Sequence, residues 1–175
     1  MLLLLPLGAA AAGPAVGDRL PSFQLPAPDS AAARTDLGVA ADTTFDPAAI
    51  DGRLLLIEIF SMYCPHCQRE APAVNRLYQA VTASPALGAK VRVIGIGVGN
   101  SPYEVDLFRK HYEIAFPLFA DEDFAIHRLL GEVRTPFFIL VDLSAANRGR
   151  IVWTGAGKLE ATDSVVAMLT SLMPR

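Results

Sequence analysis

The chain has 175 residues, of which 52% are hydrophobic and 19% are charged, and its formal net charge is -3. This length and apolar content suit one globular domain with a sizeable core, and the small negative charge without a basic block argues against nucleic acid as a partner. Two cysteines and three histidines are too few for a structural zinc site, which needs four ligands in paired spacing. The sequence therefore predicts no metal site, and nothing in it indicates a cofactor.

Residues 1–12 have the composition of a targeting segment. No charged side chain occurs before Asp18, and the alanine-rich end of the stretch from Leu2 to Ala12 is typical of a signal peptidase site. The stretch is shorter than the roughly twenty apolar residues that span a bilayer. We expect a cleaved signal peptide, although a positively charged start is missing, and a periplasmic or otherwise extracytoplasmic mature chain without a membrane span. An alanine-rich extension of a cytosolic protein is the alternative.

Residues 13–50 are rich in proline, alanine, aspartate and threonine and contain only short apolar islands. We expect an N-terminal arm that lies over the domain, with room for one short strand. The pattern then changes, because Arg53–Phe60 is a continuous apolar run broken only by Glu58. Such a run predicts a strand buried on both faces of a sheet, and Val91–Val98 predicts a second one.

A helical pattern follows each of these two strands. Apolar residues recur at helical spacing over Pro65–Ala83. A second helix is predicted to begin after Ser101, which is a good N-cap, because Pro102 suits the first turn and Glu104 completes a capping box. The glycine-rich segment Gly95–Asn100 lacks the G-x-G-x-x-G pattern of dinucleotide-binding loops. We expect it to let the strand end pass close beside the first helix.

The C-terminal part alternates again between short elements. We predict, in order, a short helix after Asp121 that stops at Gly131, a strand over Phe137–Val141, an antiparallel strand over Arg150–Thr154 and a closing helix over Thr162–Leu172. The whole order of elements predicts a single α/β domain with a mixed sheet.

The two cysteines stand together as Cys64-Pro65-His66-Cys67, at the seam between the first strand and the first helix. Such a pair can be half of a zinc site, a structural disulfide or a redox dithiol. The zinc interpretation lacks its second pair, and a structural disulfide here would close almost no loop. A helix N-terminus favours the thiolate, which is the nucleophile in disulfide exchange. The position therefore favours a redox dithiol.

With this motif in this position, the chain resembles the thioredoxin superfamily over nearly all of residues 18–172. Features that match the family are Glu58 six residues before the first cysteine, Pro72 five after the second, and Thr135-Pro136 before a strand. The start at Val16-Gly17-Asp18 and the insertion before Pro136 are similar to the redoxin branch, which includes the TlpA/ResA-type periplasmic thiol-disulfide oxidoreductases. The resemblance implies a thioredoxin-like fold over residues 51–175, in which helices flank a central mixed sheet and an insertion precedes the strand of a cis-proline.

Position assigns the roles of the motif. Cys64 is nearer the helix start and is expected to be the exposed, attacking thiolate, whereas Cys67, one turn further in, is expected to resolve the mixed disulfide. His66 can stabilise the Cys64 thiolate and make the couple more oxidising, like the Pro-His pair of DsbA-type proteins, or it can face solvent without effect.

Other residues are expected around the pair. Burial should raise the pKa of Glu58, which could relay a proton to Cys67 or only anchor a hydrogen bond in the core. Glu70 is similar to an acid found near the active site in the TlpA/ResA group, and it could tune the site or be a simple surface carboxylate. A cis-Pro136 would expose the backbone of Thr135 to a substrate strand, with Pro65 beside it.

These features predict an extracytoplasmic thiol-disulfide oxidoreductase that acts on cysteine-containing proteins, more as a reductase than as an oxidase, and that receives electrons from an upstream dithiol. Two alternatives stay open. A copper carrier similar to the Sco-type redoxins would use both cysteines and a distal histidine such as His127, although that group has a longer cysteine spacing. A peroxiredoxin-type peroxidase would match Ser61 but not Ile57, where that group has proline.

Overall fold

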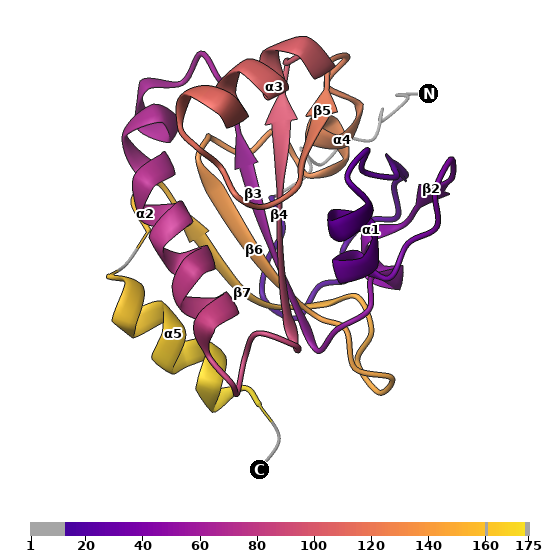
Figure 1. The fold of residues 1–175 in the computed structure, drawn as a ribbon, viewed down its shortest axis with the longest axis vertical. Helices are drawn as coiled ribbons and strands as arrows, with labels where there is room; N and C mark the ends of the chain where they lie inside the picture. Colours follow the sequence, from indigo (N-terminus) through magenta and orange to yellow (C-terminus); the bar gives the residue numbers. More distant parts are fainter. Residues whose placement is uncertain (1–12, 160, 174–175) are drawn as a thin grey trace, which may run out of the picture.

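A computed structural model describes residues 13–159 and 161–173. In this part of the chain a five-stranded sheet with the order β5-β4-β3-β6-β7 forms the centre of the molecule (Figure 1). The parallel strands β3, β4 and β5 lie side by side, and β6 runs antiparallel to both β3 and β7. The strand bounds are β3 Leu54–Phe60, β4 Val91–Val98, β5 Leu118–Asp121, β6 Phe137–Asp142 and β7 Arg150–Ala156.

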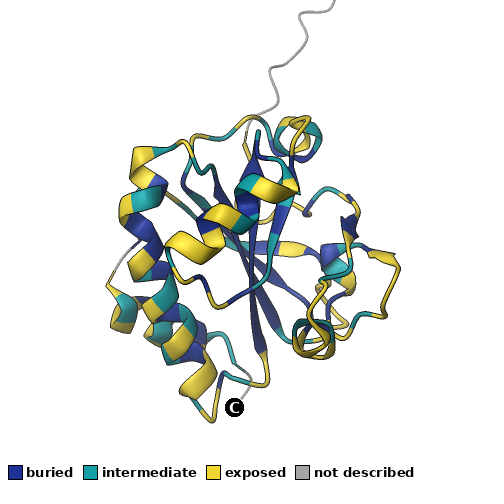
Figure 2. Ribbon diagram, turned by 45° about the horizontal axis from the view of Figure 1, so that its top comes forward, coloured by how far each residue is buried: buried dark blue, intermediate teal, exposed yellow. Residues whose placement is uncertain are grey.

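Two layers cover the sheet, one on each face (Figure 1). The helices α2, α3 and α5 pack on one face, and the N-terminal segment packs with α4 on the other. The helix bounds are α2 Pro65–Ala83, α3 Pro102–His111, α4 Ala125–Leu129 and α5 Thr162–Ser171. The central strands β3, β4 and β6 are almost wholly buried, whereas the outer strands β5 and β7 are only partly buried (Figure 2).

Alternation along β3 divides the core into two parts. Successive side chains of a strand point to opposite faces of the sheet. Leu56 and Phe60 accordingly pack with Cys67 and the helix α2, whereas Ile57 and Ile59 pack against the N-terminal segment. Glu58 lies between Leu56 and Phe60 in this alternation, so its side chain is on the α2 face, the face of the cysteines.

The N-terminal segment has more structure than the single short strand we expected. It forms β1 (Leu25–Pro26) and β2 (Thr44–Phe45), which pair with each other, and between them α1 (Ala31–Leu37); a 3-10 turn, η1, follows at Pro47–Ala49. Ser30 caps α1, and Gly38 ends it with a φ of 68°. Leu25, Leu37 and Ile50 are fully buried against the sheet. These elements are too short to show a period in sequence, and it is the sheet beneath them that orders them.

The strand β5 is a second element that the sequence did not indicate. It has four residues, of which only alternate ones are buried, and it pairs with the end of β4 at the edge of the sheet. The other predicted helices and strands are present within a residue or two of the expected bounds. The capping box of Ser101 and Glu104 at the start of α3 is confirmed, with both of its hydrogen bonds formed.

In the residues that the structure describes, no helix combines the length and the apolar character that a membrane crossing requires. The predicted signal peptide, residues 1–12, lies outside the described residues.

Candidate functional site

The two cysteines occupy the junction that the sequence indicated. The strand β3 ends at Phe60, the loop Ser61–Tyr63 follows, and Cys64 is the N-cap of α2, with extended backbone angles of -85° and 113°. Pro65 takes the first helical position, where its missing N–H costs no hydrogen bond. Both cysteines are free thiols. Cys64 therefore stands at the helix N-terminus, and Cys67 lies inside the first turn.

Cys64 is partly exposed, and its sulfur lies 3.4 Å from the carbonyl oxygen of Thr135. Partial burial acts to raise the pKa of this thiol, but hydrogen bonds from the Thr135 side chain and from the backbone N–H groups of Cys67 and His66 outweigh it. The net effect lowers the pKa of Cys64 below its ordinary value of 9.0. This sulfur is consequently the better nucleophile of the two near neutral pH.

Cys67 has the opposite environment. Its side chain is 0% exposed and packs in the core with Leu56 and Phe60. Burial raises the pKa of this thiol to about 12, so it stays protonated near neutral pH. The pair therefore combines an accessible, acidic thiol with a buried, weakly acidic one.

Pro136 lies across from the cysteines, at the start of β6. The Thr135–Pro136 peptide bond is cis, as the family resemblance implied. Pairing of Ile59 with Phe137 sets this end of β6 beside the end of β3, and so beside the loop that leads to Cys64. Thr135 thus comes into contact with a sulfur 71 residues away in the sequence.

Glu58 is buried beneath this site. Its side chain is 2% exposed, and its Oε1 atom has no hydrogen-bond partner within the described residues. Burial raises the pKa of Glu58 to about 8, with a smaller contribution from the charge of Glu70. A carboxyl with this pKa can hold or release a proton near neutral pH.

Glu70 is buried as well and is not a surface carboxylate. It is 7% exposed, and its Oε1 accepts a hydrogen bond of 2.9 Å from the backbone N–H of Leu159. The contact joins α2 to the segment before α5. The charge of Glu70 also contributes to the raised pKa of Glu58, so the two buried carboxyl groups interact electrostatically.

The side chain of His66 lies at the surface beside Arg69. Its side chain is exposed, and Nδ1 lies 3.0 Å from a guanidinium nitrogen of Arg69. Arginine can only donate hydrogen bonds, so Nδ1 is the acceptor in this contact. The group of His66 that acts on Cys64 is its backbone N–H.

Sequence reasoning missed Asn100, which follows β4. The side chain is 0% exposed, and its Oδ1 accepts a hydrogen bond of 2.8 Å from the backbone N–H of Met62, in the loop before Cys64. In the sequence, the segment Gly95–Asn100 stands out for its glycines. The available signal was a polar residue at the end of a run of otherwise buried apolar residues.

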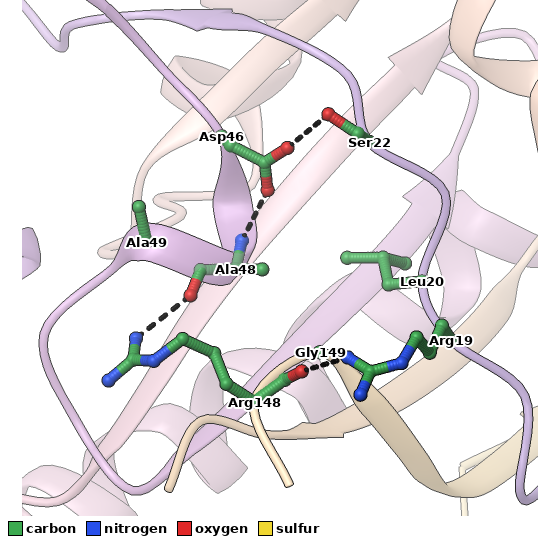
Figure 3. Close-up of a pocket in the computed structure, with 8 residues that line it drawn as sticks. All are labelled: Arg19, Leu20, Ser22, Asp46, Ala48, Ala49, Arg148 and Gly149. Atoms are coloured by element: carbon green, nitrogen blue, oxygen red, sulfur yellow. Dashed lines mark hydrogen bonds between the residues drawn. The ribbon is translucent and has the colours of Figure 1, made fainter. Parts of the chain in front are cut away.

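A shallow surface hollow of about 310 Å³ lies elsewhere, between the N-terminal segment and the turn from β6 to β7 (Figure 3). In it the guanidinium of Arg19 donates to the carbonyl of Arg148, and that of Arg148 donates to the carbonyl of Ala48. The turn is at the end of β6 opposite Pro136, so this hollow is separate from the cysteine site.

A comparison with known protein families gives a match over most of the chain. Residues 16–162 match the AhpC/TSA family, and the chain belongs to that family. No curated protein sequence matches the chain with comparable significance. The family match confirms the resemblance to the redoxin branch of the thioredoxin superfamily.

Several solved structures share the fold. A putative thiol:disulfide interchange protein DsbE from Chlorobium tepidum is 16% identical, with a TM-score of 0.67 over 90% of this chain and 97% of that one. A secreted Mycobacterium tuberculosis disulfide oxidoreductase homologous to Escherichia coli DsbE is 18% identical, with a TM-score of 0.60 over 85% and 95%. StoA from Bacillus subtilis is 18% identical, with a TM-score of 0.59 over 87% and 96%. These likenesses confirm the expected α/β, thioredoxin-like fold.

Proposed function

We propose that this protein is a thiol-disulfide oxidoreductase that exchanges disulfides with cysteine-containing proteins through Cys64 and Cys67. The observation that carries the proposal is the contrast between the two thiols, one accessible with a lowered pKa and one buried with a pKa of about 12. The structures of similar fold described as a disulfide oxidoreductase and a thiol:disulfide interchange protein support the same class.

The exchange follows from these two environments. The Cys64 thiolate attacks one sulfur of a substrate disulfide, and the other substrate sulfur leaves as a thiolate and takes up a proton. Cys67 then gives its proton to a base, for which the ionised form of Glu58 is suited, and attacks the sulfur of Cys64. The second substrate sulfur leaves, and two electrons have passed from the dithiol to the substrate. An upstream dithiol donor restores the reduced pair.

We propose that the substrate is recognised at Thr135 and Pro136, across from the cysteines. The backbone of Thr135 beside Pro136 could pair with an extended substrate segment, because it already lies within contact distance of Cys64. Pro65 is exposed at the helix start and would lie against the same segment.

We further propose that the protein works as a reductase. An imidazole directed at Cys64 would favour the thiolate and make the couple more oxidising, but the side chain of His66 is exposed and contacts Arg69. The expected reduction potential is then closer to thioredoxin, at roughly -270 mV, than to DsbA, at roughly -120 mV. Equilibration of the Cys64–Cys67 couple with glutathione measures this reduction potential. A potential near that of DsbA would contradict the proposal that the protein is a reductase.

An extracytoplasmic location is also a proposal. It rests on the apolar residues 1–12, and one protein of similar fold is described as secreted. On this basis residues 1–12 would be removed, leaving the arm of residues 13–50 and the thioredoxin-like domain of residues 51–175. Fusion of residues 1–30 to alkaline phosphatase, which is active only after export, tests the export signal.

Reduction of insulin disulfides by dithiothreitol tests the activity. The wild-type protein should accelerate it, and Cys64→Ser should abolish the acceleration. Two further assays address the alternatives, since turnover of hydrogen peroxide would indicate a peroxidase and tight binding of Cu(I) that depends on His127 would indicate a copper carrier. His127 has its Nε2 2.9 Å from the carbonyl oxygen of Val133, so we expect no dependence on it.

A further inference from the structure

The loop before Cys64 is held by side chains on both sides of Met62. The backbone N–H of Met62 donates to Oδ1 of Asn100 at 2.8 Å, and the carbonyl of Met62 accepts from Nε2 of Gln68 at 2.7 Å. Both backbone polar groups of this residue are thus satisfied by side chains, and neither takes part in the sheet. A loop tethered in this way has little freedom to shift.

Asn100 is buried in the interior, where its side chain makes this contact with Met62. Its side chain is 0% exposed, and its Nδ2 also lies 3.4 Å from the hydroxyl of Ser61. A side chain on Gly97 would crowd it, because a Cβ there would be 3.2 Å from Oδ1 of Asn100 and closer still to Phe60 and Val105. Burying an amide is costly unless it is hydrogen-bonded, and most of the partners of this amide are in the loop Ser61–Tyr63.

The tethered loop touches both sulfur-bearing residues. The carbonyl of Ser61 accepts from the backbone N–H of Cys64 at 3.0 Å. Gln68, which binds the carbonyl of Met62, directly follows Cys67 in α2, and the backbone of Ser61 acts to lower the pKa of the Cys67 thiol. A displacement of Ser61 and Met62 would therefore change the surroundings of both thiols.

We propose that Asn100 is a positioning residue for the redox reaction: it fixes Ser61 and Met62 so that Cys67 is aligned to attack the mixed disulfide on Cys64. This inference rests on the function proposed above and concerns its second step. In that step the Cys67 sulfur forms a bond to the Cys64 sulfur, the bond from Cys64 to the substrate sulfur breaks, and the substrate thiolate leaves. Asn100 touches none of these atoms and acts through the loop.

The test separates the two chemical steps. Reduced protein is mixed with Ellman's reagent, whose disulfide is attacked by Cys64 with release of one thionitrobenzoate; attack by Cys67 then releases the second. Acid quenching at successive times and mass spectrometry count the protein that carries the mixed disulfide. Asn100→Leu, which keeps the size of the side chain but removes its acceptor, should slow the second step between about tenfold and a hundredfold, the range expected when a reacting group is misplaced.

Two variants control for general loss of structure. Asn100→Asp keeps an acceptor for the N–H of Met62 and should restore most of the rate. Asn75 in α2 is a matched asparagine, because it bonds to the backbone of Tyr112, Glu113 and Ala115 in the same manner but away from the cysteines. Asn75→Leu should therefore resolve the mixed disulfide at the wild-type rate.

Gln68→Ala removes the other tether of Met62 and must slow the same step, even if Asn100→Leu does not fold.

The outcomes are distinguishable. Resolution at the wild-type rate in folded Asn100→Leu and Gln68→Ala would overturn the positioning role and leave the proposed function intact. Equal slowing in Asn75→Leu would also overturn it, since the effect would then be one of stability. A wild-type protein that ends with both thiols capped and forms no internal disulfide would overturn the proposed function itself.

Discussion

Burial of Glu58 makes a quantitative prediction about stability and pH. The folded protein holds this carboxyl at a pKa of about 8, whereas its ordinary value is 4.5. Between these values the unfolded chain ionises Glu58 and the folded chain does not, so the free energy of the unfolded state falls relative to that of the folded state as pH rises. The stability of the protein should therefore fall from about pH 4.5 to about pH 8 and change no further through this group above that.

The magnitude follows from the same two values. They differ by about 3.5, and each unit corresponds to about 1.4 kcal/mol, so the full loss is about 5 kcal/mol. About 3 kcal/mol of it should already be present at about pH 7. This is a large part of the stability of a typical domain, which is about 5–15 kcal/mol.

Urea denaturation of the reduced protein measures the effect, followed by the fluorescence of the single tryptophan, Trp153. Wild type and Glu58→Gln are compared from about pH 5 to about pH 9, because glutamine cannot ionise and other groups cancel in the difference. The two stabilities should diverge as pH rises, in favour of the variant. Glu70→Gln should lower the upper end of the window, since the charge of Glu70 contributes to the raised pKa. Parallel curves for wild type and Glu58→Gln would refute the reasoning.

Three further predictions concern the thiols, the N-terminal segment and α3. Iodoacetamide at neutral pH should modify Cys64 and spare Cys67, because Cys67 is buried with a pKa of about 12; peptide mass mapping would contradict this if both were labelled equally. Leu25→Ala should lower the free energy of unfolding, measured by urea denaturation, by about 2–5 kcal/mol, because Leu25 is fully buried against the sheet. A decrease below about 1 kcal/mol would mean that the N-terminal segment is not part of the folded core. Ser101→Ala removes the capping box of α3 and should cost about 1 kcal/mol. The exposed Ser164→Ala should change stability by less than about 0.5 kcal/mol, and equal effects in thermal denaturation would argue against the cap.

The long elements were predictable because each carries its own signal. The run from Leu54 to Phe60 and the helical spacing after Pro65 lie within single segments, and so does the capping box at Ser101. The short elements were not, because they depend on partners. The strand β5 exists through its pairing with β4, and α1 is ordered where Leu37 meets the sheet.

In the candidate site, too, some features were predictable from the local sequence and others depend on distant partners. The burial of Glu58 was expected from the apolar run around it. The burial of Glu70 was not, because it depends on Leu159, which is 89 residues away. Asn100 was overlooked for the same reason, since its role depends on Met62, 38 residues earlier. No local sequence pattern identifies contacts between residues that are this far apart in the chain.

By itself the sequence predicted the chemistry proposed for this protein. Two cysteines one helical turn apart, between a buried strand and a helix start, favour a redox dithiol, because spacing and the helix N-terminus are local properties. Only the tertiary structure decided how the two thiols differ. Their pKa values depend on burial and on groups such as Thr135 that folding brings close, and the same folding placed Asn100 behind the loop before Cys64.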